Sequence, residues 1–579
     1  MPNADVQKLE SLSRGFRSTY LKNADVEAQL HAWRDAFPHL VHLRSIGETL
    51  ERRPLWVVTI GPDPERARPS AWIDGNMHAT ELAGSSVALA MAEDILRIHL
   101  DKDAEVHGLA PHVRARLRDV LFYVLPRICP DGAECVLGEG KYVRSNPRDR
   151  RPNKLHARWI AGDVDGDGAA LSMRKEDPGG EFVESKDVPG LLLPRAIEDV
   201  GPFYKVYPEG TIENFDGATI PNPYFLSDNE VDLNRNFPWS WSPEPEQPGA
   251  GAYPTSEPES RAIVEFITRH PEVFAWLNLH TFGGVFIRPL GHKDDKKMDP
   301  SDLALFRQLE QWGKDLTGYP MVSGFEEFLY EPDKPLHGDL SDFGYNQRGA
   351  IAYVCELWDL FKQIGVERKK PFVDHYTHMT KDDMLKLARW DAEHNKGRVL
   401  RPWKKFKHPQ LGDVEVGGID TRVGMSNPPY EMLPQVCDQQ SSMFLRVAAL
   451  APQVVVAKVT QTEVGSGLRR VDVTVENHGY LPTYVLSSAK ALAWNEPLHA
   501  DVTTQDCELA TPSDAHREVG HLEGWGRGLF DGSSALFYMQ SKGNAHSKTL
   551  HYVVRGGGVL TLKVGSCRTG FIERRIELG

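Results

Sequence analysis

The fold of this 579-residue chain is decided by residues 70–100, which read SAWIDGNMHATELAGSSVALAMAEDILRIHL. Residues 70–74 have the apolar composition of a buried strand, and residues 82–100 have the pattern of a helix. His78 and Glu81 stand three positions apart at the expected start of the helix, so an imidazole nitrogen and a carboxylate can close on one Zn²⁺. Chance supplies about three such pairs among 22 His and 81 acidic residues, so this pair needs support from the rest of the chain.

Further apolar runs predict the sheet to which this strand belongs. They cover residues 41–46, 55–60, 120–125, 273–279 and 350–355, and helical patterns separate several of them. Strands that are apolar on both faces suit a mostly parallel sheet covered by helices. The sequence therefore predicts an α/β fold with a mixed, mostly parallel central sheet, and such folds place their sites at strand ends.

The texture of the sequence changes after residue 452. An amphipathic helix over residues 433–450 is expected to close the first domain, and the following segments read as short strands joined by turns that contain Gly and Asn. We therefore expect a catalytic domain over residues 1–452 and a separate all-β sandwich over residues 453–579.

Three other segments give weaker signals. Residues 5–36 are expected to be helical, and residues 403–418 read as a linker. Residues 136–230 form a long, charged insertion in the first domain, rich in Gly and Pro and with little periodicity. Loops of that length tend to be functional.

Within this insertion, oxygen-bearing side chains alternate as they do at the opening of a calcium loop. Asp163, Asp165 and Asp167 stand at alternate positions, and Gly168 follows them. Arg174 occupies the position where such a loop needs its bidentate Glu. Calcium binding by the three aspartates is therefore one hypothesis, and an ordinary acidic turn is the favoured alternative.

Composition argues against several classes of partner. The formal net charge is −14 and no long Lys/Arg run compensates it, which argues against nucleic acid and against an anionic membrane surface. No stretch approaches about 20 consecutive apolar residues, and the start of the chain lacks the pattern of a signal peptide. We therefore expect a cytoplasmic location.

A catalytic zinc needs a third protein ligand and an open position for water. His280 is the best candidate, because it follows the buried strand over residues 273–279 and precedes a turn of small residues. Taken singly, a histidine at a strand end is more often hydrogen-bonded within the sheet. Together with His78 and Glu81, it completes a ligand set.

These residues resemble a known family, the zinc metallocarboxypeptidases of the carboxypeptidase A type, in the form of a bacterial-like member with a C-terminal β-sandwich. The resemblance covers roughly residues 41–450, with gaps, and rests on motifs that follow the order of the family. The motifs are His78-x-x-Glu81, Pro130-Asp131-Gly132, Asp232-Leu233-Asn234-Arg235-Asn236, His280, and Asp342-Phe343-Gly344-Tyr345-Asn346-Gln347 leading to Glu356. The resemblance implies a carboxypeptidase-like fold and one catalytic zinc.

The resemblance also implies a role for each matching residue. His78, Glu81 and His280 would bind zinc, and Asp232 would fix the tautomer of His78 from behind.

Further matches concern the substrate and the reaction. Asn234 and Arg235 match the pair that receives the terminal carboxylate of the substrate. Arg144 stands where the family keeps the arginine that polarises the scissile carbonyl, and Arg148 is the fallback for it.

Glu356 matches the general base of the family, and a carboxylate at the end of an apolar strand is unusual unless it is paired or functional. The tyrosine that closes over substrate in the family aligns without gaps to Lys334, so Tyr330 is our candidate for that role.

The expected function is hydrolysis of the C-terminal peptide bond of peptides or proteins by zinc-activated water. One alternative is a zinc amidohydrolase acting on cell-wall peptides or acyl amino acids, because Asn234 and Arg235 suit any substrate with a free carboxylate. Another alternative is a catalytically inactive peptide-binding homologue. Glu356 argues against it, since a binding protein needs no general base.

Overall fold

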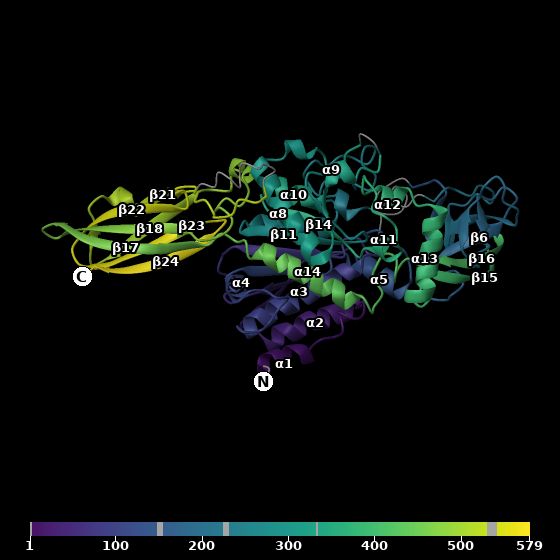
Figure 1. Cartoon of the computed structure of the whole chain (residues 1–579), viewed down its shortest axis with the longest axis horizontal. Helices are drawn as coiled ribbons and strands as arrows, with labels where there is room; N and C mark the ends of the chain where they lie inside the picture. The colour runs from purple at the N-terminus through teal and green to yellow at the C-terminus, as the bar shows by residue number, and fades with distance from the viewer. Residues whose placement is uncertain (1–2, 148–153, 224–230, 332–333, 530–540, 579) are drawn as a thin grey trace.

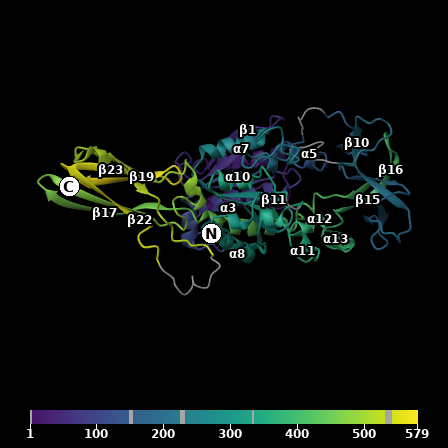
Figure 2. The same cartoon turned by 90° about the horizontal axis from the view of Figure 1, so that it is seen from above.

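The computed structural model describes residues 3–147, 154–223, 231–331, 334–529 and 541–578. Three regions follow one another along the long axis of the molecule (Figures 1 and 2). The C-terminal strands lie at one end, a helix-covered sheet lies in the middle, and a smaller sheet formed largely by the insertion lies at the other end.

The middle region contains an eight-stranded sheet with the strand order β1-β2-β4-β3-β11-β14-β12-β13. The pairs β3–β4, β3–β11, β11–β14 and β12–β13 are parallel, and the remaining neighbours are antiparallel. The prediction of a mixed, mostly parallel sheet is therefore confirmed. The strands are β1 (Val41–Glu48), β2 (Pro54–Ile60), β3 (Ser70–Gly75), β4 (Leu121–Leu125), β11 (Val273–Thr281), β12 (Val285–Arg288), β13 (Met321–Ser323) and β14 (Ile351–Leu357).

Helices cover both faces of this sheet. On one face, α3 (Ala83–Leu100) packs on β3 and β11, and α14 (Leu433–Ala448) packs on α3. On the other face, the ring of Trp72 lies against Phe266 of α7 (Pro258–Arg269), and the ring of Trp276 lies against Phe343 of α10 (Leu340–Asn346). Figure 1 shows α10 and α14 on opposite sides of β11 and β14. Because side chains alternate along a strand, Trp72 and Asp74 share a face, and so do Trp276, Asn278 and His280.

The other helices of the middle region are α4 (Pro111–Leu117), α5 (Pro130–Gly138), α8 (Pro300–Thr317), α9 (Gly324–Glu327), α11 (Leu360–Gln363) and α12 (Asp374–Thr377). Helix α13 (Lys381–His394) lies beside the smaller sheet and contacts β8 (Leu192–Pro194) (Figure 1).

The N-terminal helix expected over residues 5–36 is two helices, α1 (Ala4–Ser11) and α2 (Asn23–Ala36). The break contains Gly15, whose φ of 82° lies outside the helical region. Glycine is also unfavourable in the interior of a helix. The apolar residues on both sides of the break still face the same core.

The insertion is not a structureless loop. It contains β5 (Arg158–Ala161), β6 (Ser172–Glu176), β7 (Phe182–Glu184), β8 (Leu192–Pro194), β9 (Phe203–Pro208) and β10 (Gly210–Glu213). Strands β5 and β10 pair with each other, and the other four enter a six-stranded sheet with the order β15-β16-β6-β9-β7-β8.

The segment expected to be a linker supplies the two remaining strands of that sheet. Strands β15 (Leu400–His408) and β16 (Gly412–Ile419) form a hairpin, and β16 pairs with β6. Charged side chains cover the exposed positions of β15, which hides the period-two pattern of a half-buried strand. The linker prediction is therefore wrong.

The C-terminal region consists of two four-stranded sheets whose neighbours are all antiparallel. One sheet has the order β17-β18-β22-β20 and the other β21-β19-β23-β24. Valine, leucine and isoleucine side chains from both sheets share one core, as in a sandwich. The strands are β17 (Val454–Gly465), β18 (Leu468–Asn477), β19 (Leu498–Gln505), β20 (Glu508–Leu509), β21 (His516–Gly520), β22 (Ser547–Arg555), β23 (Gly558–Ser566) and β24 (Gly570–Leu578).

The boundary expected at residue 452 separates the sheets more cleanly than it separates the cores. Leu481, Val485, Leu486 and Ala489 belong to the core cluster that surrounds the central sheet.

Within the described part of the chain, no helix is long and apolar enough to cross a membrane.

Candidate active site

His78 and Glu81 lie in the turn that joins β3 to α3, just before the helix begins at Ala83. Asn76 holds this turn, because its side-chain amide donates 2.9 Å hydrogen bonds to the carbonyl oxygens of His78 and Ala79. Its φ of 57° suits asparagine, which tolerates the left-handed region better than most residues. The turn therefore presents both side chains at the carboxyl end of β3.

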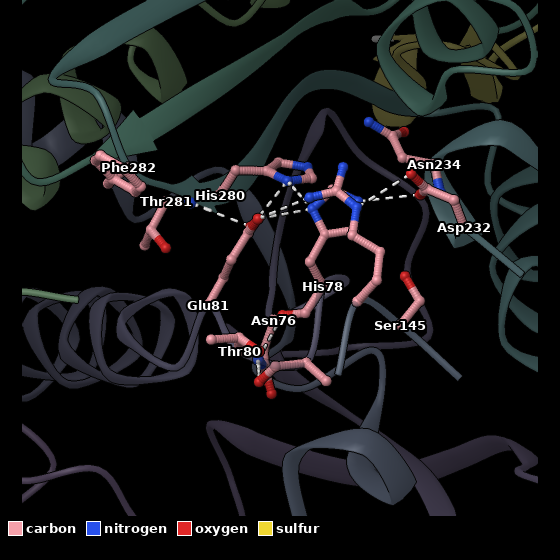
Figure 3. A network of polar contacts seen from close by, with 12 residues as sticks. Asn76, His78, Thr80, Glu81, Ser145, Asp232, Asn234, His280, Thr281 and Phe282 are labelled. Carbon is pink, nitrogen blue, oxygen red and sulfur yellow. Dashed lines mark hydrogen bonds and ion pairs between the residues drawn. The ribbon is translucent and has the colours of Figure 1, made fainter. Parts of the chain in front are cut away.

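His280 arrives from the neighbouring strand. Strand β11 pairs in parallel with β3, so both strands end at the same edge of the sheet. Nδ1 of His280 lies 3.0 Å from Nδ1 of His78 and 3.0 Å from Oε2 of Glu81, while Nδ1 of His78 lies 2.8 Å from Oε1 of Glu81. Figure 3 shows the three side chains pointing toward one another, and all three are buried.

The outer nitrogen of each ring has a partner of its own. Nε2 of His78 lies 3.1 Å from Oδ1 of Asp232, and Nε2 of His280 makes a short hydrogen bond with Oδ1 of Asn278. The backbone amide of Thr281 donates to Oε2 of Glu81 at 3.1 Å. Two imidazoles and one carboxylate are thus held with their free lone pairs converging, which is the donor set of an open zinc site.

Neighbouring charges control the protonation of this group. Burial alone would raise the pKa of Glu81, but the imidazoles of His78 and His280 hold that pKa far below its usual value. Burial lowers the pKa of His280. Burial and Arg144 also act to lower the pKa of His78, and the carboxylates of Glu81 and Asp232 reverse that shift. A cation bound here would therefore compete with a proton on the imidazole of His78, beside the ionised carboxylates of Glu81 and Asp232.

Arg144 bridges the two carboxylates of the group. Its Nε donates to Oδ2 of Asp232 at 3.2 Å, and its Nη1 lies 3.5 Å from Oε1 of Glu81. Although burial raises the pKa of Asp232, Arg144 and His78 hold it well below its usual range. Arg148, the fallback for Arg144, lies outside the described residues.

Asp232 begins the 3₁₀ turn Leu233–Arg235, and its carboxylate accepts from the amide of Asn234 at 2.8 Å. The side chain of Asn234 accepts from the amide of Leu340 at 2.9 Å and lies 3.4 Å from Asp339. Arg235 is 9% exposed, and its Nη1 donates to the carbonyl oxygen of Asn234 at 2.7 Å.

A cavity of about 520 Å³ opens beside this turn. Arg144, Asp232, Arg235 and Tyr330 are among the residues that line it. The Tyr330 side chain is 54% exposed, so it stands at the mouth of the cavity rather than in the core. The structure thus brings Tyr330 to the same cavity as the residues expected to bind substrate.

Glu356 lies at the end of β14, directly opposite His280 on β11. Its side chain is partly exposed, unlike the apolar residues before it. Burial and the nearby carboxylate of Glu81 raise the pKa of Glu356 well above its usual value, and Arg144 opposes that shift. A pKa raised in this way is typical of carboxyl groups that exchange protons in active sites.

Two neighbours of the site, Tyr376 and Asn278, were not identified from the sequence. Tyr376 of α12 donates its hydroxyl to the carbonyl oxygen of Phe282 and packs edge-on against that ring. Its position beside the site depends on a contact between segments almost one hundred residues apart, which no local pattern reveals. Asn278 interrupts an apolar strand, and such a buried polar residue is a signal that sequence reasoning can use.

The acidic loop gives the calcium hypothesis no support. Asp163 accepts hydrogen bonds from the amides of Gly166, Asp167 and Gly168, and Asp167 pairs with Lys404 at 2.6 Å. Carboxylate atoms of Asp163, Asp165 and Glu209 lie within 4.8 Å of one another, and both oxygens of the buried Glu209 accept from backbone amides, those of Val164 and Leu171. The loop is an acidic turn that bonds to its own backbone.

The sequence model of the family described as zinc carboxypeptidase matches residues 26–172 and 213–366, which is more than half of the chain. The chain belongs to this family. A second model, described as a domain of unknown function, matches residues 453–577.

Curated relatives carry the same family name at low identity. Carboxypeptidase A4 of Mus musculus is 23% identical over 366 residues, covering 61% of this chain and 67% of the relative. Carboxypeptidase E of Caenorhabditis elegans is 27% identical over 172 residues, covering 29% of this chain and 32% of the relative. The chain thus spans two thirds of one relative and one third of the other.

Two solved structures also align with this member of the family. Thrombin activatable fibrinolysis inhibitor aligns with a TM-score of 0.44 and 15% identity, over 77% of this chain and 79% of its own. Carboxypeptidase A of Helicoverpa armigera aligns with a TM-score of 0.38 and 19% identity, over 68% of this chain and 80% of its own. Membership of the zinc carboxypeptidases implies a zinc ion, and His78, Glu81 and His280 offer the donor atoms that fit it.

Proposed function

We propose that this chain is a zinc-dependent carboxypeptidase that hydrolyses the C-terminal peptide bond of peptides or proteins. Nδ1 of His78, Nδ1 of His280 and the carboxylate of Glu81 would hold the ion, with Asp232 orienting His78 from behind. When bound, zinc acts as a Lewis acid that polarises a carbonyl and lowers the pKa of water.

Side chains of the chain itself would move the protons. The Glu356 carboxylate, opposite His280 in the sheet, would accept a proton from the attacking water and return it to the nitrogen of the leaving amine. The Arg144 guanidinium, which contacts the carboxylates of Glu81 and Asp232, would stabilise the negative charge that develops on the scissile carbonyl oxygen. Tyr330, at the mouth of the cavity, would close over bound substrate.

The proposal rests mainly on the surroundings of the Arg235 guanidinium. This group is buried at the wall of the cavity, and among the described residues no carboxylate forms an ion pair with it. The charge of Arg235 acts to lower the pKa values of Asp232 and Asp339, but neither carboxylate is paired with the guanidinium, so an anion in the cavity can pair with it. A planar guanidinium binds a carboxylate through two hydrogen bonds, and the second hydrogen of the Asn234 amide can add a third.

We extend the proposal to the organisation of the chain. Every residue assigned to the reaction precedes residue 452, so the strands of residues 453–579 form an accessory region without a catalytic group. The family match ends at residue 366, before this point, and the C-terminal match begins at residue 453, just after it, which supports the division.

One peptide in two forms tests the proposal. The unmutated protein should release the last residue from the free-acid peptide, and the same peptide with an amidated C-terminus should be a poor substrate because Arg235 then faces no charge. A chelator should abolish the reaction, and added zinc should restore it. Equal rates on the two forms would contradict a carboxypeptidase and favour an amidase or endopeptidase.

A further inference from the structure

A chain of buried polar side chains lies behind His280, on the side away from the cavity. It consists of Asp74 on β3 and Asn278 on β11, which stand opposite each other in the register of the two strands. Asp74 and Asn278 are fully buried, and His280 is 1% exposed. Polar groups at this depth are retained only where their hydrogen bonds are satisfied.

The hydrogen bonds of Asp74 identify it as an acceptor on both oxygens. The indole nitrogens of Trp72 and Trp276 donate to its Oδ2 at 2.6 and 2.9 Å, and Nδ2 of Asn278 donates to its Oδ1 at 2.5 Å. An indole N–H can only donate, so Oδ2 has no room for a proton. The carboxylate therefore draws the amino group of the Asn278 amide toward itself.

The orientation of Asn278 then decides the tautomer of His280. With Nδ2 turned to Asp74, the amide presents Oδ1 to Nε2 of His280, and a carbonyl oxygen can only accept. Oδ1 of Asn278 therefore favours the hydrogen on Nε2 of His280, which leaves the lone pair of Nδ1 facing His78 and Glu81. A ring with the hydrogen on Nδ1 could not bind a metal through that atom.

We propose that Asp74 and Asn278 are positioning residues that set the tautomer and the ring orientation of His280 for metal binding. The relay reaches His280 over two side chains, whereas Asp232 acts on His78 directly. Neither Asp74 nor Asn278 touches the cavity that would hold substrate. The inference rests on the proposed metal site, but its measurements concern the metal and the imidazole rather than turnover.

The simpler alternative is that Asp74 serves only to satisfy two buried indoles. The isosteric variant Asp74→Asn separates the two ideas. Its carbonyl oxygen must face the indoles, so its amino group faces Asn278 and turns that amide over. The amino group of Asn278 would then meet Nε2 of His280 and move the imidazole hydrogen to Nδ1.

The first measurement is the nitrogen-15 NMR spectrum of the metal-free protein at pH 8, with the His280 signals assigned by their loss in His280→Gln. The unmutated protein should show the hydrogen on Nε2 of His280, and Asp74→Asn should show it on Nδ1. Zinc affinity, measured by competition with a chromophoric chelator, should fall roughly 10- to 100-fold in Asp74→Asn, as it does when partners behind metal ligands are lost.

The exchanged variant Asp74→Asn/Asn278→Asp supplies the rescue. Asparagine at position 74 accepts from both indoles and donates to aspartate at position 278, whose other oxygen accepts from Nε2 of His280. The tautomer and the zinc affinity should return toward those of the unmutated protein. Asp302→Asn is the matched control, because it alters a 2% exposed carboxylate that bonds Tyr345 and Ser488 far from the relay, and zinc affinity should not change.

Three outcomes would overturn the proposal. They are a metal-free unmutated protein with the hydrogen on Nδ1 of His280, an Asp74→Asn variant that binds zinc normally, and an exchanged variant no better than Asp74→Asn. If Asp74→Asn does not fold, Asn278→Leu removes the acceptor while keeping the shape of the side chain. Normal zinc affinity in that variant would also overturn the proposal.

Discussion

His280 and Glu356 stand directly across from each other on the parallel strands β11 and β14. The register of the sheet thus places the proposed metal ligand His280 and a carboxyl group with a raised pKa at one edge. Neither group depends on the other for its position, so they can be altered separately.

Changing Glu356→Gln should therefore separate chemistry from metal binding. The volume of the side chain is kept and the three ligands are untouched, so zinc content should be normal. Turnover should fall at least about 10²-fold, the usual cost of losing a general base. The measurement is kcat on a free-acid peptide beside metal analysis of the same sample.

The matched control is Glu331→Gln, which alters an exposed carboxylate at the same cavity that pairs with Lys334. Its turnover should stay within a few-fold of the unmutated protein. Undiminished turnover in Glu356→Gln would remove Glu356 from the mechanism.

Arg235 should determine the demand for a free C-terminus. Arg235→Ala removes the buried cation, and we expect a loss of about 2–5 kcal/mol in transition-state binding of free-acid peptides, measured from kcat/KM. Arg235→Lys should recover only part of this loss, because an ammonium cannot form two parallel hydrogen bonds. Lys334→Ala, which removes an ion-paired cation from the same cavity, is the control and should change kcat/KM little. A similar loss on amidated and free-acid peptides would contradict the assignment.

The metal should depend on both histidines of the group. One zinc per chain is expected, and His280→Ala should lower its affinity by orders of magnitude because one of three protein ligands is lost. His551→Ala is the control, since that exposed imidazole also contacts a carboxylate, that of Asp472. If the double variant His78→Ala/His280→Ala still retained one tightly bound zinc, the metal site would lie elsewhere.

The C-terminal region should stabilise the catalytic sheet through Arg568. This fully buried guanidinium donates to the carbonyl oxygens of Val273, Arg348 and Gly349, at 2.6, 2.7 and 3.1 Å, where β11 and β14 begin. Arg568→Met keeps much of the side-chain length but leaves these acceptors unpaired. It should lower the free energy of unfolding by about 2–4 kcal/mol in urea titrations.

Arg574→Met provides the comparison, because Arg574 is an exposed arginine of the same region. Equal stability of the two variants would show that the contact with β11 and β14 contributes little.

A chain that ends near residue 452 loses Arg568 together with Leu481 and Val485 of the main core, so we expect it to be poorly soluble.

The sequence was most informative where chemistry and strand ends coincide. His78, His280 and Glu356 each follow an apolar run, and parallel strands end at one edge, so the meeting of these side chains could be predicted. The partners behind them were harder to predict. Asp232 came from the resemblance to the family, and the relay through Asn278 needed the register of β3 against β11.

Long-range strand pairing explains the main errors in the fold. The insertion reads as a loop because β7 and β8 are only three residues long and β6 finds its partner β16 some 240 positions away. No sequence pattern within either segment predicts this pairing. The hairpin of β15 and β16 is local, and it was missed because charged side chains cover exposed positions of β15. Its apolar residues pack against the insertion rather than the central core.

His99, in the final turn of α3, should make the protein less stable in mild acid. Burial, together with the positive charges of Arg68 and Arg118, lowers the pKa of His99 to about 4. Its Nε2 atom is buried without a hydrogen-bond partner among the described residues. The unfolded chain has the ordinary histidine pKa near 6.5 and binds the proton more readily than the folded protein. The free energy of unfolding should therefore fall as the pH drops from about 6.5 toward 4, and this contribution is absent at pH 7 and above.

At pH 5 the loss from His99 should be about 1–2 kcal/mol, and His99→Gln should remove it. We would measure urea unfolding at pH 7 and pH 5 for the unmutated protein, His99→Gln and the exposed-histidine control His112→Gln. Other groups titrate in all three proteins, so the quantity to compare is the change in the free energy of unfolding between pH 7 and pH 5. His112→Gln should lose as much stability as the unmutated protein, and His99→Gln should lose less. An equal loss in all three would mean that the folded protein accommodates a charged His99, in spite of Arg68 and Arg118.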